Sequence, residues 1–288
     1  MTTIHINEVG PRDGIQNTDV ILTVPERYEL IRSLEKTGLK TIEIGSFVNP
    51  KAVPSMARTD ELYELLGISN KYSVLVPNLK GFEIALRNDV KEICLVLCVT
   101  ESMNKRNINK SVNESVDEFK QIIKKSKKIG IRTKCYISVA FHCPFEGKVD
   151  RGYVCEITNQ IIDFGVDEIV IADTIGQANP MEVKLLFSNL LNMNKSDVFS
   201  AHFHDTKALG LANVFASLDQ GIKKFDSSIG GLGGCPFAPG SSGNLATEDL
   251  VSMLEMMNIT TGVDLDSLIH SRNLASRMTA LNLTGRII

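Results

Sequence analysis

The feature that most constrains the fold of this chain is a regular alternation of short β-branched runs with longer amphipathic stretches. The runs begin about 31 residues apart on average, which is the length of one strand-plus-helix unit. Right-handed crossovers between such units require a parallel sheet. We therefore predict eight strands, over Thr3–Val9, Thr41–Gly45, Tyr72–Val76, Glu92–Val99, Thr133–Ala140, Glu168–Asp173, Val198–His204 and Lys224–Ser228.

Between these runs, apolar residues return at intervals of three and four, which is typical of helices. Pro25 and Pro180 stand where two of the helices begin, because the first helical turn tolerates a missing N–H. The predicted helices include Arg27–Lys36, Val116–Ile129, Tyr153–Phe164, Met181–Met193 and Leu209–Gln220.

Eight such units predict an α/β protein folded as a closed (β/α)₈ TIM barrel, with an open doubly wound sheet as the main alternative. No Pro/Gly/Ser-rich linker divides the 288 residues. We therefore expect a single domain over residues 1–288, with the barrel at about 3–258 and a helical tail at about 259–288. An additional C-terminal helix, Asp264–Met278, is expected to cover the exterior of the barrel.

Composition excludes several other classes of protein. With 43% hydrophobic and 23% charged residues the chain has ample material for a core, and a net charge of −3 gives no broad attraction to nucleic acid. The longest apolar run, Ile93–Val99, is far shorter than the roughly 20 residues that cross a bilayer. A strand that begins near Ile4 leaves no room for a signal peptide, and six sparse cysteines suit reduced thiols. We expect a cytoplasmic protein that binds neither membrane nor nucleic acid.

Two histidines end the seventh predicted strand. His202 and His204 are two residues apart, so they point to the same face, a spacing typical of metal ligands. Asp205 follows them as a residue that can orient an imidazole. Two ordinary core or surface histidines remain the alternative interpretation of this pair.

Ionisable residues also end three other strands. Arg12 and Asp13 follow the first strand in a turn shaped by glycine and proline, Glu43 lies near the end of the second strand, and Asp173 ends the sixth. Taken alone, the turn could be a solvated surface turn. In a closed barrel, however, these strand ends converge on one mouth, where barrel enzymes carry their active sites. The pattern therefore favours a barrel and an enzyme together.

A glycine-rich segment follows the eighth strand, with six glycines in the fifteen residues from Gly230 to Asn244. Its position excludes a dinucleotide-binding loop, which would follow the first strand of a unit. Cys235 lies in this segment, outside every strand and helix pattern. We interpret it as a proton donor carried by a lid, with a free thiol of no catalytic role as the alternative.

These elements resemble the 3-hydroxy-3-methylglutaryl-CoA (HMG-CoA) lyase family. The resemblance runs from about residue 4 to residue 260, and related condensing barrels lack a cysteine in the corresponding loop. It is carried by the segments Glu8–Asn17, Ser46–Val48, Pro77–Gly81, Asn107–Asn109, Cys143–Gly147, Asp173–Gly176, His202–Thr206 and Gly230–Asp249.

The resemblance implies a divalent cation, Mg²⁺ or Mn²⁺, held by Asp13, His202, His204 and Asn244. It also implies an acyl-CoA substrate, cleaved to acetyl-CoA and acetoacetate in leucine degradation and ketone body formation, and a homodimer. Its catalytic residues would be Arg12 as stabiliser of the enolate, Asp13 as base, Cys235 as proton donor, and Glu43 and Asp173 as orienting or proton-relaying groups.

Other functions remain alternatives at this stage. They are a related acyl-CoA condensing enzyme or aldolase, a lyase for another 3-hydroxy-3-alkylglutaryl-CoA, and a barrel that only binds. Cys235 argues against the first, and the retention of a proton donor argues against the last. His142 stands where the family usually has glycine, which raises the question of a different acyl group.

Overall fold

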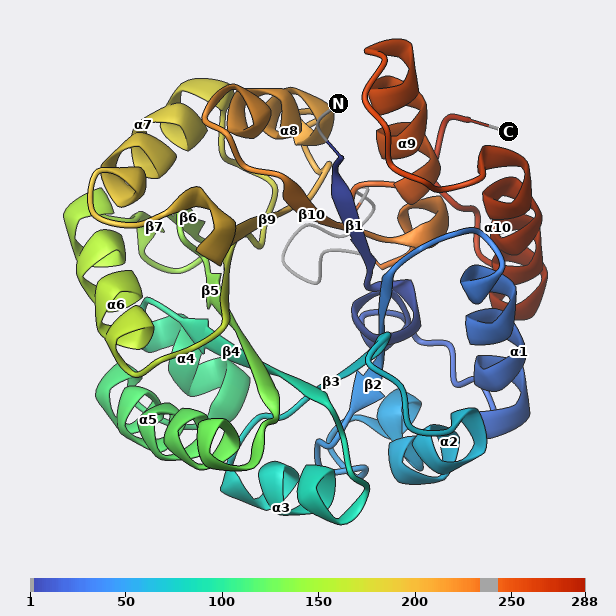
Figure 1. Cartoon of the computed structure of the whole chain (residues 1–288), viewed down its shortest axis with the longest axis horizontal. Helices are drawn as coiled ribbons and strands as arrows, with labels where there is room; N and C mark the ends of the chain where they lie inside the picture. The colour runs from blue at the N-terminus through green and yellow to red at the C-terminus, as the bar shows by residue number, and fades with distance from the viewer. Residues whose placement is uncertain (1–2, 234–242, 288) are drawn as a thin grey trace.

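The computed structural model describes residues 3–233 and 243–287, and in it eight parallel strands close into a barrel surrounded by helices (Figure 1). The order around the barrel is β1-β10-β9-β8-β5-β4-β3-β2. All eight predicted strands are present, with ends that differ by a residue or two, and the closed barrel replaces the open sheet. The barrel strands are β1 (His5–Glu8), β2 (Thr41–Ser46), β3 (Tyr72–Leu75), β4 (Glu92–Cys98), β5 (Arg132–Ser138), β8 (Glu168–Asp173), β9 (Phe199–Phe203) and β10 (Lys224–Ser227).

Six of the ten described α-helices begin after a residue whose side chain accepts from one of the first free amides. Thr23, Ser111 and Asn179 each form a reciprocal capping box with a glutamate three residues later. The helices are α1 (Val24–Glu35), α2 (Thr59–Leu66), α3 (Leu79–Arg87), α4 (Glu101–Ile108), α5 (Val112–Ile129), α6 (Arg151–Asp163), α7 (Pro180–Leu191), α8 (Gly210–Asp219), α9 (Thr247–Met256) and α10 (Leu265–Thr279).

Two features differ from the sequence prediction. The segment Asn104–Asn107 lies in a helix that is not among the predicted ones, α4, where Asn104 is fully buried and its side chain accepts from the Cys98 amide and donates to the Lys110 carbonyl. A small hairpin of β6 (His142–Cys143) and β7 (Gly147–Lys148) follows β5 and was not predicted, because two-residue strands carry no periodicity.

The core has two parts. The larger lies between the outer face of the barrel and the apolar faces of the helices. A smaller cluster of Leu75, Cys94, Tyr136 and Val170 is separate from it, with Val96 packed against it. Leu75, Val96 and Tyr136 also line the cavity at the mouth, so this cluster forms the floor beneath that cavity.

Ion pairs close the opposite, N-terminal end of the barrel. The buried Lys134 Nζ lies 3.3 Å from Glu168 Oε1 and 3.7 Å from Glu92 Oε1, and Lys224 Nζ lies 3.0 Å from Glu168 Oε2. Glu92, Glu168 and Lys224 are the first residues of their strands. The pairing supplies each buried charge with a partner, which burial requires.

The helix of the C-terminal tail, α10, packs beside α1 (Figure 1). The Ser33 and Ser271 hydroxyl oxygens are 2.7 Å apart, and the Asp264 amide donates to the Thr37 carbonyl at 2.7 Å. Within the described residues, no helix combines the length and the apolar character that a membrane span needs.

Candidate active site at the barrel mouth

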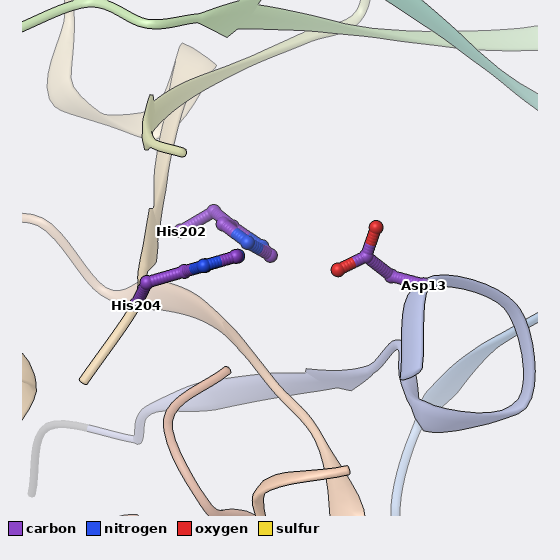
Figure 2. A group of neighbouring side chains, drawn as sticks. All are labelled: Asp13, His202 and His204. Atoms are coloured by element: carbon purple, nitrogen blue, oxygen red, sulfur yellow. The ribbon is translucent and has the colours of Figure 1, made fainter. Parts of the chain in front are cut away.

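Three side chains that the sequence singles out meet at the C-terminal mouth of the barrel. The ligand atoms of Asp13, His202 and His204 all lie within 4.8 Å of one another. In Figure 2 the two imidazoles point toward the Asp13 carboxylate. The two histidines lie side by side because side chains alternate along β9. Residues 202 and 204 point into the barrel, and Phe203 between them is buried against the helices.

Asp13 is presented by a tight π-helical turn over Gly10–Gly14. One carbonyl, that of Val9, accepts from the amides of Arg12, Asp13 and Gly14 at 3.1, 2.7 and 3.2 Å. A side chain at Gly14 would bring its Cβ within 2.9 Å of the Leu232 carbonyl oxygen, so glycine lets the turn sit against the segment after β10. The sequence predicted a turn here, but not its π-helical form.

Arg12 is held in place by carboxylates. Its guanidinium donates to Glu43 and to Asp13, and the Tyr136 hydroxyl donates to Glu43 Oε2 at 2.9 Å. Burial alone would lower the pKa of Arg12, but Glu43 and Asp13 raise it above its ordinary value. A permanent, fixed positive charge therefore faces the mouth.

The neighbouring charges set the protonation of the central cluster. Burial by itself would raise the pKa of Asp13, but Arg12 and the two histidines lower it well below its usual range. Burial, followed by the charge of His202, lowers the pKa of His204 to about 3. Asp13 is therefore an anion and His204 a neutral imidazole at physiological pH, the forms in which both bind metal ions.

His202 is oriented from behind by Asp226. Its Nδ1 lies 3.3 Å from Asp226 Oδ2, which leaves the Nε2 lone pair for the mouth. Burial would lower the pKa of His202, but the hydrogen bond and charge of Asp226 raise it. A carboxylate behind an imidazole is the arrangement that commonly orients histidine ligands of metals.

Asn244 joins the cluster from the segment after β10. Its Nδ2 donates to Asp13 Oδ2 at 2.8 Å and lies 3.2 Å from the Leu232 carbonyl. Its Oδ1 and the Nδ1 of His204 are buried and have no hydrogen-bond partner among the described residues. Unpaired buried acceptors are costly. A cation beside Asp13 would satisfy the amide oxygen, so the donor set fits a divalent ion.

The cavity in front of the cluster has a volume of about 290 Å³. Arg12, Asp13, His202 and His204 contribute to its polar wall. Neither Glu43 nor Asp173 lines it within the described part of the chain. The apolar residues that line it include Val48, Val53, Leu75, Val96, Met103 and Ile108.

Asp173 lies at the end of β8, where sequence analysis placed it, but it serves a turn. Its two carboxylate oxygens accept from the amides of Gln177 and Ala178, each at 3.0 Å. Burial raises its pKa to about 6. Glu43 likewise lies behind Arg12, and Cys235 lies outside the described residues.

Sequence reasoning missed Tyr136 and the helical form of α4. Tyr136 lies in an apolar run of β5, where only the alternation of the strand would reveal that it faces the mouth. Arg106 and Asn107 line the cavity from α4, and the Arg106 guanidinium carbon lies 4.3 Å from the centre of the Phe145 ring. His142, in contrast, does not line the cavity within the described residues, and its Nε2 lies 3.2 Å from Glu182.

A closed parallel barrel that gathers a carboxylate, two imidazoles and a fixed arginine at its C-terminal mouth defines a (β/α)₈-barrel enzyme. The chain belongs to the HMGL-like family, whose family model matches residues 3–275. This confirms the family that the sequence motifs indicate.

Individual relatives cover almost the whole chain. The hydroxymethylglutaryl-CoA lyase YngG of Bacillus subtilis is 43% identical over 92% of this chain and 90% of its own. A crystal structure of the Bacillus subtilis HMG-CoA lyase has a TM-score of 0.96 at 40% identity and covers 99% of this chain and 97% of that one. An HMG-CoA lyase of Acinetobacter baumannii, in complex with coenzyme A and 3-methylmalate, has a TM-score of 0.94 at 35% identity and covers 99% and 93%.

Proposed function

We propose that this enzyme is an HMG-CoA lyase, which cleaves 3-hydroxy-3-methylglutaryl-CoA to acetyl-CoA and acetoacetate with the help of a divalent cation. The observation that carries the proposal is the cluster of Asp13, His202 and His204 beside the fixed guanidinium of Arg12. Membership of the HMGL-like family supports the same reaction.

Asp13, His202, His204 and Asn244 would hold the cation. The unpaired Asn244 oxygen and the neutral state of His204 support this assignment. Mg²⁺ and Mn²⁺ both suit a donor set of carboxylate, amide and imidazole groups. When bound, the cation would lower the pKa of the substrate's tertiary hydroxyl group.

The chain's own residues would then move the protons. Asp13, ionised at neutral pH, accepts the hydroxyl proton while the bond between C2 and C3 of the acyl group breaks. The electron pair passes to the acetyl-CoA half as an enolate, and Arg12 stabilises its oxygen. Cys235 delivers its thiol proton to the enolate carbon, which completes acetyl-CoA and leaves acetoacetate.

Glu43 and Asp173 would act as orienting groups in this scheme. Glu43 fixes Arg12 and is itself fixed by Tyr136, so the guanidinium does not need to reorganise as negative charge develops. Asp173 holds the turn after β8 through two backbone amides. Because neither reaches the cavity, a direct proton relay through them is the less favoured role.

A coupled assay tests the proposal. Protein stripped with EDTA should release no acetyl-CoA from HMG-CoA, and added Mg²⁺ or Mn²⁺ should restore the release. As a control, 3-methylglutaryl-CoA lacks the tertiary hydroxyl and should not be cleaved. Full activity in metal-free protein would refute the requirement for a cation, and no product with either ion would refute the lyase.

Three further properties are part of this proposal. Five described cysteines are free thiols, which suits the reducing cytoplasm as the compartment. A homodimer would appear as twice the chain mass in sedimentation equilibrium. Participation in leucine degradation and ketone body formation would follow from the products, acetyl-CoA and acetoacetate.

A further inference from the structure

The segment Leu283–Ile287, which follows α10, lies across the loops at the mouth of the barrel. The amides of Thr284 and Gly285 both donate to the Gly230 carbonyl, at 2.9 and 3.1 Å. A Cβ on Gly230 would lie 2.4 Å from Leu283 Cδ1, and its φ of +65° also favours glycine. The segment, which we call the C-terminal strap, is therefore seated directly on the chain that follows β10.

Arg286 is the side chain through which the strap reaches the site. Its Nη2 lies 2.8 Å from Asp205 Oδ2 and its Nη1 lies 3.0 Å from Asp249 Oδ2. The second oxygen of each carboxylate is already fixed by the backbone. Asp205 Oδ1 accepts from the Gly210 amide at 2.9 Å, and Asp249 Oδ1 accepts from the Arg286 and Ile287 amides at 2.7 and 3.0 Å.

The burial of Asp205 and Asp249 distinguishes their ion pairs with Arg286 from an ordinary surface ion pair. An exposed pair contributes little, because solvent screens it and both side chains lose freedom. Here Arg286 is half exposed, but both carboxylates are buried and held at fixed positions. A planar guanidinium that spans two fixed carboxylates sets the distance between them, which the single ammonium of lysine cannot do.

The two carboxylates bracket the segment that carries Asn244. On one side, Asp205 directly follows His204, and its amide donates to the Gly243 carbonyl at 2.7 Å. On the other side, Asp249 lies in the first turn of α9. Between them, the Leu245 amide donates to the Phe203 carbonyl at 3.2 Å. Asn244 thus occupies a short span that is fixed at both ends.

We propose that Arg286 is a positioning residue, which ties the end of β9 to the start of α9 and so presents His204 and Asn244 to Asp13 at a spacing that suits a cation. The effect of Arg286 on turnover rests on the proposed function. Its effect on the conformational order of residues 243–249 is independent of that function. A strap that only anchored the tail would leave both properties unchanged when the guanidinium is removed.

Hydrogen exchange of the cation-free protein tests the positioning directly. In Arg286→Ala, the amides of Leu245 and Thr247 should exchange about 10-fold faster than in wild type, while those of β4 and β5 keep their protection. Arg277→Ala is the matched control, since Arg277 is exposed on α10 and has no ion pair among the described residues. It should exchange as wild type does.

Calorimetry with Mn²⁺ and steady-state kinetics complete the test. Arg286→Ala should bind Mn²⁺ about 10-fold more weakly and lose about 10-fold in kcat at saturating Mn²⁺, with KM for HMG-CoA within about two-fold. The values for Arg286→Lys should fall between those of wild type and Arg286→Ala, because lysine keeps the positive charge but lacks the planar guanidinium that spans both carboxylates.

A lower melting temperature with wild-type exchange at Leu245 and Thr247, wild-type Mn²⁺ affinity and wild-type kcat would overturn the proposal. If wild type itself bound no Mn²⁺, the proposed function would fail. In that case, exchange at Leu245 and Thr247 alone would decide whether Arg286 positions the segment.

Discussion

At the scale of single residues, the groups at the mouth act through their partners. Arg12 is fixed by Glu43 and Asp13, and Tyr136 fixes Glu43 from the barrel floor. A charge that is already oriented before the reaction begins stabilises the transition state more than the ground state. The contribution of such a residue appears in kcat rather than in substrate binding.

Arg12→Gln should therefore lower kcat by about 10²–10³-fold, the loss typical of one removed oxyanion donor. Steady-state kinetics should show KM nearly unchanged, and calorimetry should show Mn²⁺ binding that remains measurable. The reason is that the enolate charge exists only around the transition state. A loss confined to KM would contradict this role and make Arg12 a substrate-binding residue.

Cys235→Ala should lower kcat by about 10²–10⁴-fold, the usual contribution of a positioned acid. Alkylation with iodoacetamide should inactivate wild type, and a substrate analogue should slow that reaction. Cys155→Ala is the matched control, because Cys155 is a partly exposed thiol on α6 and away from the mouth. Turnover of Cys235→Ala close to wild type would make the thiol a bystander.

At the scale of elements, the sequence predicts what is periodic and misses what is local. The barrel strands follow from β-branched runs buried on both faces, and His202 and His204 follow from the two-residue repeat of β9. The π-helical turn at Gly10–Gly14 depends on three amides that share one carbonyl. The polar composition of α4 hides this helix from an analysis of apolar periodicity. The burial of its Asn104 depends on tertiary contacts, which no local sequence pattern encodes.

The first strand also carries a buried acid that links elements. Glu8 accepts from the Gly10 and Ile229 amides, each at 2.8 Å, and from the Thr247 hydroxyl at 2.7 Å. Burial raises its pKa from 4.5 to about 7 in spite of these bonds. A raised carboxyl pKa means that the folded state binds the proton more tightly than the unfolded state does.

Stability from Glu8 is therefore fully present below about pH 4.5 and is lost as pH rises through about 7. Glu8→Gln cannot titrate, so its free energy of unfolding should decline by roughly 3 kcal/mol less than that of wild type between pH 4.5 and pH 8. Urea denaturation at several pH values measures the difference. Glu29→Gln, at an exposed site on α1, should keep the wild-type slope, and an equal slope in Glu8→Gln would refute the assignment.

At the scale of the whole molecule, we expect the barrel of residues 3–258 and the tail of 259–288 to unfold as a single domain. The packing of α10 beside α1 supports this expectation. Circular dichroism and the fluorescence of the tyrosines should then report one coincident transition in denaturant. Two separate transitions would divide the chain into two domains.

A cation that binds only the folded protein should stabilise the whole molecule. At 100 times its dissociation constant, Mn²⁺ should raise the free energy of unfolding by about 2.7 kcal/mol. Calorimetric melting with and without Mn²⁺ measures the effect. His204→Ala should show a much smaller increase, and an undiminished increase would mean that His204 is not a ligand.

The pairing of β1 with β10 has a consequence for the order in which the protein is made. On a ribosome that adds about 5–20 residues per second, β1 emerges roughly 200 residues and about 10–40 s before β10, which pairs with one of its two edges, whereas β2, which pairs with the other, follows early. During this interval the nascent half-barrel exposes an unpaired edge, which is a hazard for aggregation. Asp13 is synthesised early and meets His202, His204 and Asn244 only after translation is nearly complete, so the active site is among the last parts of the molecule to form.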